Sequence, residues 1–213
     1  VLVTCISVTD DFVIIPLHPF FLHSPSKDHR SNVIGNAYYD DREPLLFYVV
    51  GIQTSSLLAV YQSDAAFVSH AVNAFSGNAG MDLFVDLVVY DDASLLQKYL
   101  RIENLRYKAK GQVVPSGSLR RYSLSRLPVE AARFDGAAGQ METFPMAMSH
   151  YLSDAVVQNA CINPRYSGLP YRYAYGVAVK RADRGRPGVW WNAIARMDGL
   201  ERKKAGEWAE TGG

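Results

Sequence analysis

The stretch from Phe67 to Asp86, with the sequence FVSHAVNAFSGNAGMDLFVD, constrains the fold of this chain more than any other part. Apolar residues recur through both of its halves, and a cluster of Gly, Asn and Ser at 76–80 separates them. Such a cluster supplies the positive φ angles that a tight reversal needs, so the pattern predicts a β-hairpin with His70 on its first strand. A lone His in an apolar strand is usually a hydrogen-bonded interior residue, and spacing alone favours that interpretation over a metal ligand.

Short apolar segments separated by turn residues continue along the chain, which is typical of an antiparallel β fold. We expect further strands within residues 1–21, 44–52, 57–61, 118–127, 166–179 and 190–197. Residues 91–105 follow a helical spacing instead and predict one short helix. The run 131–140 has no strong period and is interpreted as a connection between sheets. Together these patterns predict an all-β fold in a single domain spanning 1–213, and a sandwich fits them on pattern alone.

The charge balance gives no electrostatic reason to expect a nucleic acid as a partner, because 22 basic and 21 acidic residues leave a formal net charge of +1. The two cysteines, Cys5 and Cys161, lie far apart and form no CxxC pair, which indicates a reducing, cytoplasmic compartment. No signal peptide is visible, and the longest apolar run, at 12–17, is far shorter than the roughly 20 residues that cross a bilayer. The start V-L-V-T-C-I-S, without a Met, is what a fragment of a longer protein looks like.

Several stretches together resemble the carotenoid cleavage oxygenase family. The segment H-A-V-N-A-F from His70, a turn, and then D-L-F-V-D-L is similar to the family's F-H-x-x-N-A-[YF]-E-E, followed by a turn and a V-V-D-L strand. Further matches fall in the family's order, at Y-Q-S-D-A (61–65), R-R-Y-S-L (120–124), and I-N through G-L-P-Y-R-Y-A-Y-G (162–176). The animal branch, with β-carotene oxygenases and the retinoid isomerase of the eye, gives the closest likeness. The resemblance implies a partial seven-bladed β-propeller, of which this chain would form the middle blades.

The resemblance also implies a metal site. The family's F-H-x-x-N histidine is one of four that hold a catalytic iron, so His70 is the expected iron(II) ligand. Another ligand opens the family's H-[DS]-F-x-[IL]-T stretch, where Thr4 stands here, and a hydroxyl replaces imidazole poorly at iron. The other two ligands would lie outside the chain. The segment M-E-T-F-P is similar to the family's [FVI]-E-[FLT]-P-x-I-N, which makes Glu142 the expected outer-shell partner and residues 146–161 an insertion before Ile162.

The function that the resemblance implies is iron(II)-dependent cleavage of a carotenoid, in which dioxygen adds across a conjugated double bond. The partners are then a small apolar polyene and dioxygen, with a peripheral membrane contact of the full protein for substrate uptake. Two alternatives stay open. Thr4, together with Ser76 where the family usually has Glu, favours a non-catalytic carotenoid- or retinoid-binding relative that has lost the metal. A retinoid ester isomerase would keep the iron and change the reaction.

The remaining histidines have a simpler interpretation. His18, His23 and His29 lie in or near the polar, turn-rich segment 20–41, and without a supporting Cys or carboxylate pattern we interpret them as solvated loop residues. His150 matches no motif and is interpreted as incidental.

Two further groups of side chains favour structural over binding roles. Arg120 and Arg121 could hold an anion, but at the start of a strand they favour a salt-bridged edge. Tyr171, Tyr173 and Tyr175 alternate and are expected to share one packed sheet face, the alternative being a stacking surface for a polyene. Because an incomplete propeller exposes strand edges, we expect the isolated chain to be poorly stable or to self-associate.

Overall fold

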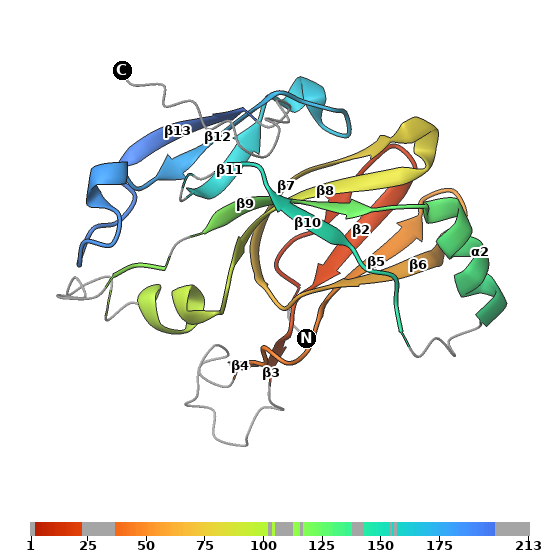
Figure 1. Cartoon of the computed structure of the whole chain (residues 1–213), viewed down its shortest axis with the longest axis horizontal. Coiled ribbons are helices and arrows are strands. Elements are labelled where there is room, and N and C mark those ends of the chain that lie inside the picture. The colour runs from red at the N-terminus through yellow and green to blue at the C-terminus, as the bar shows by residue number, and fades with distance from the viewer. Residues whose placement is uncertain are drawn as a thin grey trace.

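The computed structural model describes residues 3–22, 37–101, 104, 113–115, 117–137, 143–153, 155 and 157–198. Its strands form three antiparallel sheets and one separate two-stranded pair (Figure 1). Within the described ranges, no helix has the length and apolar character that crossing a membrane requires.

The first sheet has the strand order β1-β2-β5-β6. Its strands are β1 (Ser7–Val8), β2 (Phe12–Leu17), β5 (Leu45–Gly51) and β6 (Ser56–Ser63). The predicted reversal before β2 is present, and the Thr9 hydroxyl accepts a hydrogen bond of 3.0 Å from the Phe12 amide there. The separate pair consists of β3 (Phe20–Leu22) and β4 (Ala37–Tyr39).

The second sheet has the order β10-β9-β8-β7 and contains the predicted hairpin. Its strands are β7 (Phe67–Gly77), β8 (Asp82–Tyr90), β9 (Ser118–Leu124) and β10 (Met148–Tyr151). A short 3-10 turn, η2 (Asn78–Gly80), joins β7 to β8. Its backbone takes φ of 54° at Ala79 and 84° at Gly80, so the reversal uses the positive angles that the Gly/Asn cluster predicted.

The third sheet has three strands in the order β11-β12-β13. They are β11 (Val157–Ile162), β12 (Tyr173–Ala178) and β13 (Ala193–Asp198). The short turns η4 (Pro164–Tyr166) and η5 (Arg181–Asp183) lie in the connections on either side of β12. Residues 146–161, which the sequence presented as an insertion, contain β10 and most of β11.

The helical content differs in part from the prediction. Within the described part of 91–105, a π-helical turn forms at η3 (Leu95–Tyr99). An α-helix, α2 (Leu127–Ala137), lies where the sequence suggested a connection between sheets. The helix begins before the run 131–140, in which we found no strong period. Its start has two signals, Pro128, which suits a first helical turn, and Leu127, which is buried in the core. The remainder of the helix has only a weak amphipathic pattern, so the sequence did not predict it.

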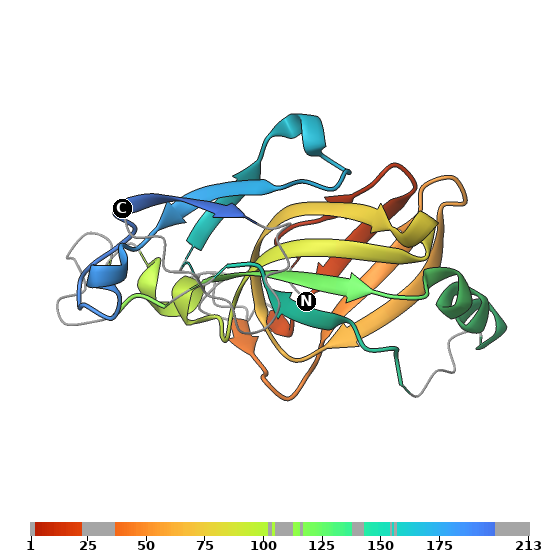
Figure 2. The same ribbon diagram turned by 45° about the horizontal axis from the view of Figure 1, so that its top comes forward.

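The second sheet is buried on both faces and lies between the other two. Leu83, Val85 and Leu87 of β8 join the core shared with the first sheet. On the opposite face of the same strand, Val88 and Tyr90 join the core shared with the third sheet. This explains the nearly continuous apolar sequence of β8, since a strand covered on both sides has no polar face. The three sheets therefore form a row, with the yellow strands β7 and β8 in its middle (Figure 2).

Candidate functional site

His70 lies on β7 between two irregularities in the pairing of that strand with β8. The register shifts between Val68 and His70 and again between Ala71 and Asn73, so Ser69 has no direct partner on β8. Such β-bulges break the alternation of a strand and redirect its side chains. β7 is the end strand of its sheet and contacts both β1 and β11. The half-buried His70 is thus held on the strand where the three sheets meet.

Thr4 lies beside this strand. Its hydroxyl donates a hydrogen bond of 2.7 Å to the carbonyl oxygen of Val68, two residues before His70. The residue at the second expected ligand position therefore lies next to the strand that carries His70. Its only hydroxyl proton is directed at the backbone, so Thr4 ties the N-terminal segment to β7.

Glu142 lies outside the described residues. Gln158 of β11 reaches Ser69, the residue before His70. The Gln158 side-chain oxygen accepts hydrogen bonds from the Tyr90 hydroxyl at 2.8 Å and from the Ser69 hydroxyl at 3.3 Å. Ser69 is the bulge residue directly before His70. The signal that could have found Gln158 is its spacing, because it precedes Ile162 by the four residues that separate Glu from Ile in the family motif.

Two glycines allow this network to form. A Cβ on Gly117 would lie 2.9 Å from the Tyr90 hydroxyl oxygen and 2.6 Å from the Val157 carbonyl oxygen. A Cβ on Gly176 would lie 2.4 Å from a Val157 methyl carbon. Burial raises the pKa of Tyr90, so its hydroxyl stays protonated and remains a donor to Gln158.

A buried polar cluster joins three of the motifs that carry the resemblance. Arg121 of β9 donates two hydrogen bonds of 2.8 Å to the carboxylate of Asp86 on β8, and the Tyr171 hydroxyl donates a third at 2.5 Å. Asp86 is completely buried, and the Arg121 guanidinium lies 4.8 Å from the centre of the Phe75 ring. Burial and the neighbouring carboxylate raise the pKa of Tyr171. The cluster links the second sheet to the segment before β12.

The expected salt-bridged edge is thus wrong for Arg121, which lies inside a sheet between β8 and β10. Arg120 lies on the same inner strand, so the edge is wrong for it as well, but the expected salt bridge is present, since its guanidinium pairs at 3.2 Å with the exposed Asp91. The expected tyrosine row is also wrong. Tyr171 is 1% exposed in the polar cluster, whereas Tyr175 is 42% exposed on the outer face of β12, because the chain does not enter the strand until Tyr173.

Asn73, directly opposite Asp86 in the pairing of β7 with β8, binds the same segment of the third sheet. Its side-chain amide donates to the carbonyl oxygen of Leu169 at 2.9 Å and accepts from the Gly168 amide at 3.1 Å. Asn73 and Asp86 therefore fasten the segment 166–171 to the second sheet from two neighbouring positions. Both side chains therefore have a structural role, since their polar atoms are taken up by the hydrogen bonds named above.

The other histidines differ from the expectation in one case. His18 is 1% exposed, not solvated, because the chain reverses between β2 and β3 underneath Phe67, whose ring centre is 4.8 Å away. Neither of its ring nitrogens has a hydrogen-bond partner, and burial lowers its pKa to about 4. His23 and His29 lie outside the described residues. His150 is exposed on β10.

The described residues do not form a complete iron site. No group of three or more His, Cys, Asp or Glu side chains among them could hold a metal ion. Four imidazoles are expected from the resemblance, and this part of the chain brings only His70 to the strand junction. A single imidazole does not fix a metal ion, so the four imidazoles that the resemblance implies would need residues beyond those described.

A row of antiparallel sheets joined through the first strand of each defines this chain as part of a β-propeller. The family model described as RPE65, retinal pigment epithelial membrane protein, matches residues 5–212. The chain therefore belongs to the RPE65 family, that of the carotenoid cleavage oxygenases.

Similar proteins agree with this assignment. The chain is 25% identical over 214 residues to carotenoid cleavage dioxygenase 8 of Arabidopsis thaliana, a match that covers 97% of this chain and 34% of that protein. It is 26% identical over 145 residues to torulene dioxygenase of Fusarium fujikuroi, covering 58% of this chain and 23% of the relative.

Solved structures confirm the partial propeller fold. Cobalt-substituted Synechocystis apocarotenoid oxygenase superposes with a TM-score of 0.63 at 16% identity, over 92% of this chain and 36% of that one. A chimera of that oxygenase with RPE65 gives a TM-score of 0.64 at 17% identity, over 91% and 35%. The chain thus spans about a third of the length of carotenoid cleavage dioxygenase 8 and of these two solved structures.

Proposed function

We propose that this chain forms the His70-bearing part of an iron(II)-dependent dioxygenase that cleaves a carotenoid. The observation that carries the proposal is the position of His70 at a β-bulge on the strand where three sheets meet. Membership of the carotenoid oxygenase family supports it, as do the two relatives that are named dioxygenases.

In this proposal His70 offers one imidazole, and the remaining imidazoles come from residues outside this chain. Imidazole suits iron(II), and iron bound by a full set would supply the activation of dioxygen. The described residues around His70 have positioning roles. The Ser69 hydroxyl lies 3.1 Å from the Val88 carbonyl oxygen and 3.3 Å from the Gln158 side-chain oxygen, and these contacts hold the bulge next to His70. Tyr90 in turn donates to Gln158. The Asp86 cluster keeps the third sheet against β8.

The proposed partners are dioxygen and a small apolar polyene, which a cytoplasmic protein would collect through a peripheral membrane contact. The loop between β12 and β13 supports that contact, since it combines exposed Arg181 and Arg186 with half-buried Trp190 and Trp191. Basic and aromatic side chains together favour the surface of an anionic bilayer. Sedimentation with vesicles containing phosphatidylserine tests it, with Arg181→Ala/Arg186→Ala as the comparison, and equal sedimentation of both proteins would contradict it.

Iron content tests the central proposal. The protein, extended to the length of its relatives and purified without chelators, should retain iron and form aldehyde or ketone products from β-carotene. His70→Ala should lose both properties, whereas His150→Ala should keep them because His150 lies exposed on β10. Iron retention by His70→Ala equal to that of the unaltered protein would contradict the ligand role.

A second candidate is a carotenoid- or retinoid-binding relative without metal, which the hydrogen bond from Thr4 to Val68 favours. Such a protein would bind β-carotene with a shift of its absorption bands, hold no iron and form no product. A third, the retinoid ester isomerase, would retain iron and convert a retinyl ester without cleaving β-carotene. Parallel incubation with the two substrates, together with the iron analysis, separates all three.

A further inference from the structure

The segment M-A-M-S-H, from Met146 to His150, places two methionines and a histidine at alternate positions. All three side chains are exposed, Met146 by 52% and Met148 by 69%. A thioether is apolar and ordinarily fills gaps inside a core. Two thioethers in water, with an imidazole at the next alternate position, indicate a role other than packing.

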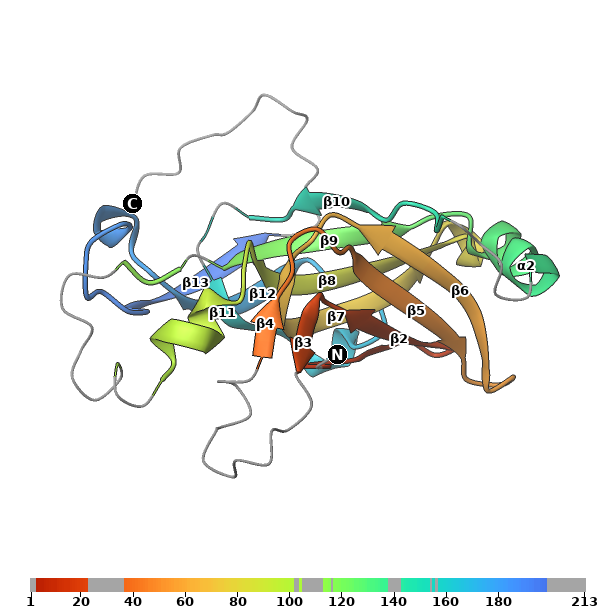
Figure 3. The ribbon, with the colours of Figure 1, turned by 90° about the horizontal axis from the view of Figure 1, so that it is seen from below.

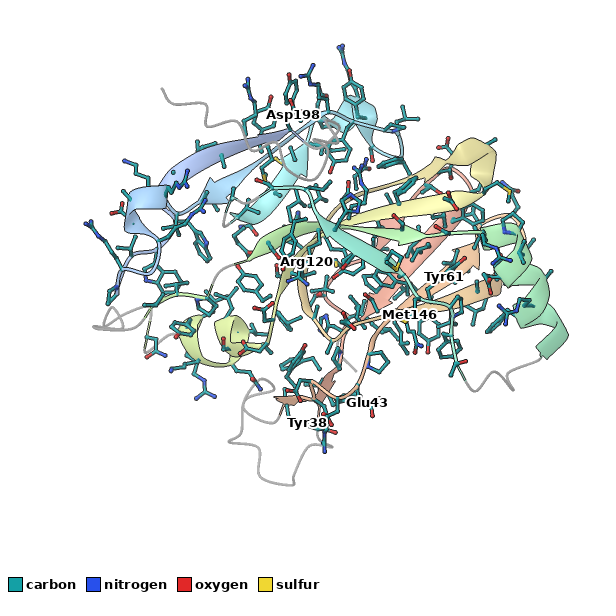
Figure 4. The ribbon with its side chains drawn as sticks, viewed as in Figure 1. Tyr38, Glu43, Tyr61, Arg120, Met146 and Asp198 are labelled. Carbon is teal, nitrogen blue, oxygen red and sulfur yellow. The ribbon has the colours of Figure 1, made fainter. Side chains whose placement is uncertain are left out.

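This segment connects the outer edges of two sheets. The amide of Gln62, on the edge strand β6, donates to the carbonyl oxygen of Pro145 at 2.9 Å, and the carbonyl oxygen of Gln62 accepts from the amide of Ala147 at 2.7 Å. From Met148 the chain continues as β10, which pairs with β9 of the second sheet. Figure 3 shows β10 at the outer edge of that sheet, and in Figure 4 Met146 lies beside β6. Backbone hydrogen bonds therefore hold the segment at both ends.

Both methionines point away from the core that lies beneath them. Ala147, between them, is 2% exposed and belongs to the core shared by the first and second sheets. Successive side chains of an extended chain point to opposite sides, so Met146 and Met148 share the side away from this core. The second sheet has another sheet of this chain on each of its faces, so the position of the two methionines is set within the described part of the chain.

His150 lies on the same side of the segment as Met148. In the pairing of β10 with β9, Met148 is opposite Ser123 and His150 is opposite Arg121. Ser123 and Arg121 are two residues apart on one strand, so they share a face, and the residues opposite them share it as well. Two thioethers and one imidazole therefore follow one another along one side of the segment.

The spacing of the three side chains allows them to share one ion. Alternate residues of a strand are about 6.6 Å apart, and the flexible methionine side chain can carry its sulfur along the strand toward a neighbour. Thioether sulfur selects Cu(I), and imidazole suits copper as well. Hard ions such as Mg²⁺ and Ca²⁺ need oxygen ligands instead, and no group of three or more His, Cys, Asp or Glu among the described residues could hold a metal ion.

We propose that Met146, Met148 and His150 bind one Cu(I) ion at the outer edge of the second sheet. The hydrogen bonds that hold the segment keep the three residues in place before the ion binds, so little ordering of the chain accompanies binding. The site is distinct from the position of His70, because β10 and β7 are the two opposite end strands of the same sheet. The inference therefore depends neither on iron nor on the proposed reaction.

A competition titration with bicinchoninate, a chelator that is coloured when it holds Cu(I), measures the affinity under anaerobic, reducing conditions. The chain carries Cys5→Ser and Cys161→Ser throughout, because free thiolates bind Cu(I) themselves. Met148→Leu should weaken binding at least about tenfold, and Met146→Leu/Met148→Leu about a hundredfold. Met81→Leu is the matched control and should change nothing, since Met81 is 43% exposed next to the start of β8, two strands away from β10.

Nuclear magnetic resonance of the chain labelled with ¹³C at its methionine methyl groups locates the ion, since Cu(I) is diamagnetic. One equivalent of Cu(I) should shift the methyl resonances of Met146 and Met148 and leave those of Met81 and the buried Met197 in place. His150→Ala should weaken Cu(I) binding while iron retention stays unchanged, which separates the two sites. Cu(I) affinity of the double methionine variant equal to that of its Cys-to-Ser parent would overturn the inference. Methyl resonances of Met146 and Met148 that do not respond to Cu(I) would do so as well.

Discussion

The hydroxyl of Thr4 donates a hydrogen bond of 2.7 Å to the carbonyl oxygen of Val68, beside the strand of His70 and at the position where the resemblance led us to expect a metal-binding imidazole. The side chain at this position links the N-terminal segment to β7 and does not offer an imidazole. This single contact bears on both the stability of the N-terminal segment and the capacity of the chain for metal.

Thr4→His should give the chain a second imidazole next to the β7 strand. We expect cobalt(II) to bind this variant at least about tenfold more tightly than the unaltered chain, since imidazole binds such ions far better than a hydroxyl. The visible absorption of cobalt(II) during titration measures the gain. The double variant Thr4→His/His70→Ala should lose it, and a gain that survives the loss of His70 would show that the new ligand works without it.

Gln158→Leu should destabilise the chain by about 1–3 kcal/mol, because it leaves the buried Tyr90 hydroxyl without an acceptor. Urea unfolding measures the loss. The double variant Gln158→Leu/Tyr90→Phe should recover much of it, since both partners of the hydrogen bond are then apolar. If the two losses simply add, the hydrogen bond between these side chains does not contribute to stability.

Arg121→Ala should cost about 3–5 kcal/mol, because the carboxylate of Asp86 would remain buried without its cation. Arg120→Ala is the matched control on the same strand. Its partner Asp91 is 94% exposed, so the loss of that ion pair should cost about 0–1 kcal/mol. The free energies of unfolding of the two variants at neutral pH give the comparison. Similar values for both would contradict the conclusion that the buried Asp86 carboxylate needs the Arg121 cation.

His18 should make the chain sensitive to acid. Its pKa is about 4 in the fold and 6.5 for the ordinary group, so the unfolded chain binds the proton first as the pH falls. The contribution of His18 to the free energy of unfolding should therefore decline from pH 6.5 down to about 4, and stay level outside that window. The total decline is about 3 kcal/mol, at roughly 1.4 kcal/mol for each pKa unit. His18→Phe should show a correspondingly shallower loss of stability on acidification, and parallel pH profiles of the two proteins would refute this role.

Much of the fold could be predicted because it depends on local pattern. The hairpin of β7 and β8 follows from two apolar runs around a Gly/Asn cluster, and the structure contains it. The α2 helix could not be found in this way. Its residues have a weak pattern, and what holds it is the packing of Leu127 into a core made by strands distant in sequence.

The candidate site, too, could be predicted from the sequence only in part. Local sequence identified the strand of His70 and the motif residues Asp86, Arg121 and Tyr171. It gives their positions along the chain but not their contacts in the fold. Their meeting in one buried cluster, the burial of His18 and the contact of Gln158 with Ser69 depend on which sheets pack together. The sequence alone determined strand positions and family, because turn chemistry and alternation are properties of neighbouring residues. Only the tertiary structure decided which polar groups lose water and which partners they find, because burial and hydrogen bonding are set by contacts between residues far apart in the chain.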